Sequence, residues 1–218
     1  MPSPLPSDEA DAVRASVLGA RYWWDEPGDQ GALCYHTENH QALFHSAEIA
    51  AGTLFPDVVF AGSGLAGRAA VDHGAARFRR WAALRARWGW SEWLSNTYTQ
   101  HNVLALCSIV DGSDDADLRE VATSLLDILF VEIAANSWRG ILGSTHGRAY
   151  VPGLLDGSTD GATTLLWLTT GLGVMADTAS VGGSPSRPAR IGRRPPSPTS
   201  PARRPRRRRP GSVRASTS

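Results

Sequence analysis

Apolar residues recur every three or four positions along the chain as far as about residue 174, a spacing that buries one face of a helix. The strongest pattern runs over 114–136, where Leu118, Leu125 and Leu129 fall on one face and acidic residues fill the first turn. Other helices are predicted over 40–54, 64–88, 99–110 and 159–174, with a helix or irregular entry segment over 11–24. The pattern therefore predicts a mainly α-helical domain.

Glycine, proline and acidic residues interrupt the pattern between these helices. Turns are predicted at 25–29, 55–56 and 111–113, and a glycine-broken connection at 140–152. Consecutive helices joined by such turns form antiparallel hairpins. We therefore interpret the chain as three helical hairpins.

The helical pattern stops before a segment made mostly of Arg, Pro and Ser. All 22 basic residues are arginine, and eleven of them lie in 187–214, where there is no acidic residue. Residues 1–182 hold the other eleven against all 21 acidic residues, a net charge of −10. A segment with so few apolar residues cannot offset the entropy lost on ordering. We predict a loose N-terminus at 1–10, a helical-hairpin domain at 11–180 and a disordered tail at 181–218.

Several classes of protein are excluded at this level. The N-terminus has no basic start and no apolar core of a signal peptide, and no stretch is long and apolar enough to span a membrane. Cys34 and Cys107 do not form a disulfide framework or a cysteine-based zinc pattern. The expectation is a cytoplasmic protein with no membrane partner and no cofactor.

Three polar segments, 34–40, 91–98 and 144–150, each come just before a predicted apolar helix. Asn39 and Asn96 are 57 residues apart, and Asn96 and His146 are 50 apart, about one hairpin each time. If the hairpins stack side by side, the three segments lie together at one end of the stack and form one open site. Helix N-termini there would present unpaired N–H groups to an anionic ligand.

The runs 22–29, 34–44, 90–96 and 144–148 resemble an uncharacterised bacterial group of six-hairpin, glycosidase-like α/α toroid proteins, over roughly residues 20–175. The resemblance implies part of an α/α toroid. The wider toroid class includes glycoside hydrolases and polysaccharide lyases, so it also implies a poly- or oligosaccharide as partner. Whether this chain is an enzyme stays open.

The resemblance gives candidate residues in two versions. In a lyase, an Asn or Arg would hold a uronate carboxylate, a His would be the base and a Tyr the acid. The residues that match this version are Asn39, Asn96, Arg148, His40, His146, Tyr98 and Tyr150. In a hydrolase, Glu38 and Glu92 would form the carboxylate pair. Trp93 would stack on a sugar face.

The chain departs from the group, because a six-hairpin toroid has about twice the hairpins seen here. We interpret the chain as truncated and the tail as an aberrant C-terminus, such as an out-of-frame product of GC-rich DNA. The alternative is a non-catalytic helical fragment. An uncovered hairpin face would favour self-association.

Three further interpretations carry less weight. Gly62–Gly67 matches G-x-G-x-x-G after an apolar run at 57–61, but no second strand ending in an acid follows, so dinucleotide binding is only a second alternative. Histidines 36, 40 and 45 lie near Glu48 without the spacing of a zinc helix, and no metal is predicted. The run 203–209 would bind nucleic acid only without sequence preference.

Overall fold

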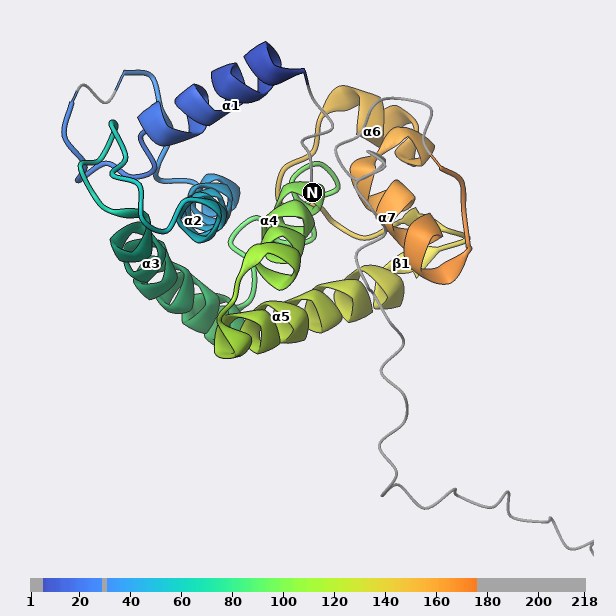
Figure 1. The fold of residues 1–218 in the computed structure, drawn as a ribbon. Helices are drawn as coiled ribbons and strands as arrows, with labels where there is room; N and C mark the ends of the chain where they lie inside the picture. Colours follow the sequence, from blue (N-terminus) through green and yellow to red (C-terminus); the bar gives the residue numbers. More distant parts are fainter. Residues whose placement is uncertain (1–5, 29–30, 176–218) are drawn as a thin grey trace, which may run out of the picture. The chain divides into compact units, whose positions relative to one another are not determined.

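A computed structural model describes residues 6–28 and 31–175, and this part of the chain is mainly α-helical, as predicted. The elements in chain order are α1 (Ser7–Gly19), α2 (Glu38–Leu54), α3 (Gly67–Trp88), α4 (Thr99–Gly112), α5 (Ala116–Ala135), β1 (Ser137–Trp138), β2 (Ile141–Leu142), α6 (Val151–Leu155), a 3₁₀ turn at Gly157–Thr159 and α7 (Gly161–Thr170) (Figure 1). The predicted loose end at 1–10 is helical from Ser7 onward. The tail predicted at 181–218 lies outside the described residues.

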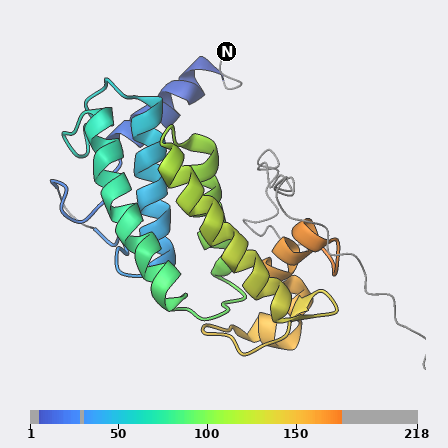
Figure 2. The ribbon, with the colours of Figure 1, turned by 90° about the horizontal axis from the view of Figure 1, so that it is seen from below.

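Helices α2 and α3 form an antiparallel hairpin along their whole length (Figure 2). At the closed end, Gly52 lies against the first residue of α3. At the open end, the indole Nε1 of Trp81 donates to the carbonyl of Glu38 at 3.1 Å. The start of α2 and the end of α3 therefore lie together, at the end of the hairpin that carries the first polar segment.

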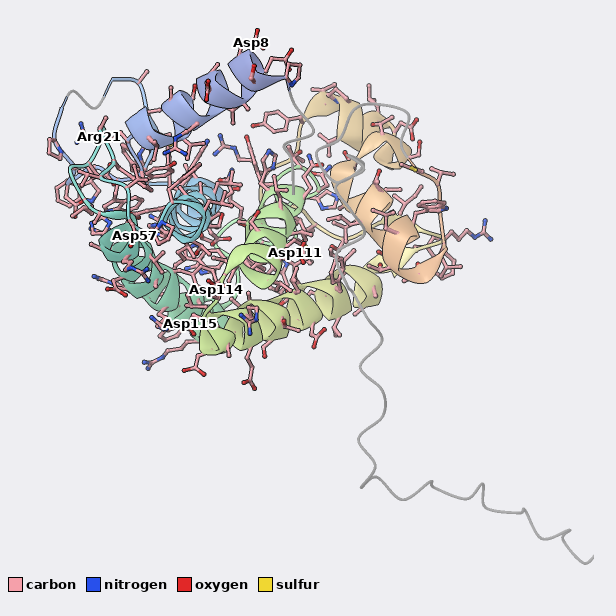
Figure 3. All side chains as sticks on the ribbon, in the orientation of Figure 1. Asp8, Arg21, Asp57, Asp111, Asp114 and Asp115 are labelled. Atoms are coloured by element: carbon pink, nitrogen blue, oxygen red, sulfur yellow. The ribbon has the colours of Figure 1, made fainter. Side chains whose placement is uncertain are left out.

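Helices α4 and α5 form the second hairpin, and α4 packs on α2. Asp115 caps α5, because its Oδ1 accepts from the backbone N–H groups of Asp117 at 2.9 Å and Leu118 at 3.2 Å. Figure 3 shows Asp111, Asp114 and Asp115 together at the connection from α4 to α5. Helix α7 contacts both α4 and α5, so α2, α4 and α7 are successive neighbours.

The main hydrophobic core lies between these helices. Its fully buried side chains include Ile49 of α2, Phe78 of α3, Leu106 and Ile109 of α4, and Leu118 of α5. A smaller cluster beside α1 contains Tyr22, Ala51, Phe60 and Ala70. Residues of α3 and α5 therefore contribute to one core, because the two hairpins share it. The apolar spacing in α3 marks a buried face only in part: Phe78 and Trp81 lie in the core, whereas Leu84 and Trp88 are 44% and 71% exposed.

Two predicted boundaries are wrong at the connections. The turn expected at 111–113 begins later, because α4 continues through Gly112. The connection expected at 140–152 contains structure: β1 pairs with β2 in a tight hairpin, and α6 follows. Arg139 and Gly140 turn that hairpin with φ of 51° and 84°. Runs of two strand residues are too short for an alternating pattern to be visible in the sequence.

The Gly62–Gly67 segment is a tight loop between α2 and α3. Val59 and Ala66 form an isolated antiparallel bridge, so the strand that the dinucleotide alternative needs at 57–61 does not form in the described chain. Gly64 has a φ of 74°, which favours glycine, and a Cβ on Gly67 would overlap the backbone carbonyl of Phe55. The glycines serve the turn and the close approach of two helices.

The last described elements expose large apolar side chains, among them Leu154 and Leu155 of α6 and Leu168 of α7. The self-association expected from an uncovered face stays a prediction. Among the described residues, no helix has the length and apolar character needed to cross a membrane.

Candidate functional site

The first and second polar segments meet at Glu38, the first residue of α2. Its Oε2 accepts from the Ser91 backbone N–H at 2.6 Å and from the Ser91 hydroxyl, and it pairs with the guanidinium of Arg85. Both charged side chains are largely buried. Glu38 therefore links the start of α2 to the end of α3 and to the segment that follows it.

The segment before α4 meets the start of α7 at Asn96, whose exposed fraction is 0%. Its Nδ2 donates to Oδ2 of Asp160 at 2.7 Å, and its carbonyl accepts from the N–H of Ala162 at 3.3 Å. Asp160 is itself buried and directly precedes α7. The beginnings of α4 and α7 are therefore held together by one asparagine.

The third polar segment lies directly on the second. The N–H of Gly147 donates to the carbonyl of Trp93 at 2.6 Å, and a Cβ on Gly147 would overlap the Trp93 backbone. His146 Nδ1 is 3.0 Å from the carbonyl of Leu94. Because a carbonyl only accepts, Nδ1 carries the hydrogen, and Nε2 of a neutral ring is left as an acceptor or base.

Four side chains from these two segments form a group at the surface. The hydroxyls of Tyr98 and Tyr150 are 2.6 Å apart, the guanidinium of Arg148 lies 5.6 Å from the Tyr98 ring centroid, and Arg148 pairs with Glu92 at 3.6 Å. Hydrogen bonds from Tyr98 and then Arg148 lower the pKa of Tyr150, and the hydrogen bond to Tyr150 raises the pKa of Tyr98. Tyr150 is therefore the more acidic of the two phenols, and pKa values pushed apart in this way are expected of a base and an acid.

A small cavity shares Glu92 with this group. Its volume is about 10 Å³, room for about one water molecule. It is lined by Trp90, Glu92, Leu94, Thr99, Asn102, Leu129, Glu132 and Ile133. Glu132 accepts from the Trp90 indole at 2.7 Å, and burial raises the pKa of Glu132. Sequence reasoning missed Glu132, although an acid within the apolar run 128–133 was a visible signal.

The other sequence candidates fall into two groups by exposure. Asn39, like Glu38 and Asn96, is buried, so none of the three can contact a ligand in this conformation. Their position indicates that they hold the segments together. His40 is half-buried with Nδ1 on the Thr37 hydroxyl, and Trp93 is 47% exposed. The candidates that remain accessible are Glu92, Trp93, Tyr98, His146, Arg148, Tyr150 and, in part, His40.

Comparisons with protein-family models, with curated proteins and with solved structures found no match.

Proposed function

We propose that this chain acts on uronate-containing poly- or oligosaccharides by β-elimination, at the surface formed by the second and third polar segments. The observation that carries the proposal is the pair of hydroxyls of Tyr98 and Tyr150, 2.6 Å apart and beside Arg148. The same proposal places the hairpins in an α/α toroid, the arrangement that the sequence resemblance implies. Successive contacts of α2, α4 and α7 support that arrangement.

In this mechanism each side chain has one task. Arg148 binds the uronate carboxylate, and its charge stabilises the negative charge that develops when the α-proton leaves. Tyr150, as phenolate, removes the proton from C5 of the uronate, and the electron pair forms the C4–C5 double bond. The C4–O bond breaks, and the departing oxygen takes the proton of Tyr98. The products are an unsaturated uronate and a shorter chain with a new reducing end.

Two neighbouring residues support binding of a sugar. Trp93 is 47% exposed and offers a flat apolar face for stacking. His146 has its Nδ1 fixed on the carbonyl of Leu94, so Nε2 is free to accept from a sugar hydroxyl.

A second candidate reaction is hydrolysis, which one observation favours. Glu92 and Glu132 line the same cavity, and burial raises the pKa of Glu132, as a general acid requires. In this reaction Glu132 would protonate the leaving oxygen, and Glu92 would be the base or nucleophile. The surface group of tyrosines would then only bind the sugar.

The experiment that separates these reactions incubates the purified chain with uronate and neutral polysaccharides. The ultraviolet absorbance of the unsaturated product and the number of new reducing ends are followed together. We expect both to rise in parallel, on uronate substrates only. New reducing ends without new absorbance would show that the reaction is hydrolysis and not elimination. No product from a folded sample would overturn the proposal.

A further inference from the structure

A second group of polar side chains lies away from this site, between α2, α3 and the segment that precedes α2. Glu26, Glu48 and His73 each offer one ligand atom, and these atoms lie within 4.8 Å of one another. Glu48 is 0% exposed and Glu26 is 6% exposed. The sequence placed Glu48 near three histidines, but His36 is exposed beside Cys34. The partners of Glu48 come from elsewhere in the chain.

Two buried carboxylate oxygens of this group have no hydrogen-bond partner within the described chain. They are Oε1 of Glu26 and Oε2 of Glu48. Burying such an oxygen without a partner is costly, and native proteins nearly always satisfy it. Burial, followed by the charge of Glu26, raises the pKa of Glu48 to about 8. A cation held between the two carboxylates would supply the missing partner for both oxygens.

The ring of His73 has the hydrogen-bonding environment that is typical of a metal-binding histidine. Nδ1 of His73 is 2.6 Å from Oε1 of Glu48, and Nε2 is 3.6 Å from Oδ1 of Asp25. Asp25 is in turn paired with Arg77. A histidine that binds a metal usually donates its other ring N–H to a carboxylate, which fixes the tautomer and the direction of the ring. Asp25 is placed to accept that N–H.

We propose that Glu26, Glu48 and His73 bind one divalent transition-metal ion, with Asp25 orienting His73. Two carboxylates and one imidazole suit ions such as Mn²⁺ and Zn²⁺. Binding of the ion displaces the proton between Nδ1 of His73 and Oε1 of Glu48, which frees Nδ1 as a ligand. The side chains of His73 and Asp25 are 24% and 37% exposed, so an ion can reach the site from solvent. The site stands independently of the proposed β-elimination.

The test uses the full chain without an affinity tag, stripped with a chelator and titrated with Zn²⁺ in a calorimeter. We expect one ion per chain and a melting temperature that rises with Zn²⁺ concentration. Glu48→Gln keeps the volume of the side chain and removes its charge, so it should weaken binding by at least about 100-fold. Asp25→Asn should weaken binding by about 10- to 100-fold, as loss of an outer partner does.

Cys34→Ser is the matched control, because Cys34 lies beside His36 and could bind zinc at the surface. It should bind Zn²⁺ like the unmodified chain. Absence of stoichiometric binding in the unmodified chain, or equally tight binding by Glu48→Gln, would overturn the proposal. If Glu48→Gln does not fold, His73→Gln makes the same test at a side chain that is 24% exposed.

Discussion

Replacing Glu38 by alanine is expected to lower the free energy of unfolding by about 3–5 kcal/mol, the usual cost of removing one partner of a buried ion pair. The carboxylate holds the side chain of Arg85 and both the N–H and hydroxyl of Ser91. Without it, the guanidinium stays largely buried and loses its counter-charge, and its Nε has no hydrogen-bond partner among the described residues. The loss also detaches the second polar segment from α2.

Urea unfolding followed by circular dichroism measures this change. Glu38→Gln should cost less, because its amide oxygen still accepts from the N–H of Ser91. The matched control is Glu120→Ala, an exposed position on α5, which should change stability by no more than about 0.5 kcal/mol. Equal stabilities of Glu38→Ala and Glu120→Ala would show that the Arg85 pair does not hold the segments together.

Replacing Tyr150 by phenylalanine is expected to lower kcat for β-elimination by about 10²- to 10⁴-fold, the usual contribution of a general base. The phenolate is the group that removes the C5 proton in the proposed mechanism. Tyr150 is exposed, so its loss should leave the fold intact. KM should change little, because Arg148 and Trp93 still bind the sugar. Initial rates of unsaturated product at several substrate concentrations give both constants.

The pH profile provides a second readout of the same mechanism. Neighbouring hydrogen bonds lower the pKa of Tyr150 from its ordinary value of 10.0. The active form has Tyr150 deprotonated, so the rate should rise with pH toward that lowered pKa, and Tyr150→Phe should lose the rise. Tyr35→Phe is the control, since its hydroxyl lies in the first polar segment and is buried with no hydrogen-bond partner among the described residues. A Tyr150→Phe variant with an unchanged rate would rule out its role as base.

Much of the helical order could be predicted, because the apolar spacing in α5, and that of Phe78 and Trp81 in α3, reflects a real buried face. The end of α3 is marked by Gly89, with a φ of 73°. The start of α5 is marked by Asp115, whose side chain caps the helix. These signals are local, so one sequence shows them. The short β1–β2 hairpin is held by a turn and by tertiary contacts, which leave no periodic pattern.

The candidate site was predicted only in part, because its long-range partners are set by packing. The polar segments were visible from their position before apolar helices. Sequence could not show that Asn96 is buried against Asp160, 64 residues away. Nor could it show that His73 faces Glu48 across a helical hairpin. The sequence showed histidines 36, 40 and 45 near Glu48 but predicted no metal there, whereas the fold brings Glu26 and His73 from other elements to Glu48.

The most direct test of the central claim is to find which residues an oligouronate contacts. An NMR titration of the labelled chain with a short oligouronate would follow the backbone amides and the indole N–H of Trp93. We predict saturable shifts in both the 92–98 and the 146–150 segments, because Tyr98 and Tyr150 belong to one surface. An absence of shifts, or shifts confined to other elements, would contradict a carbohydrate site at this surface.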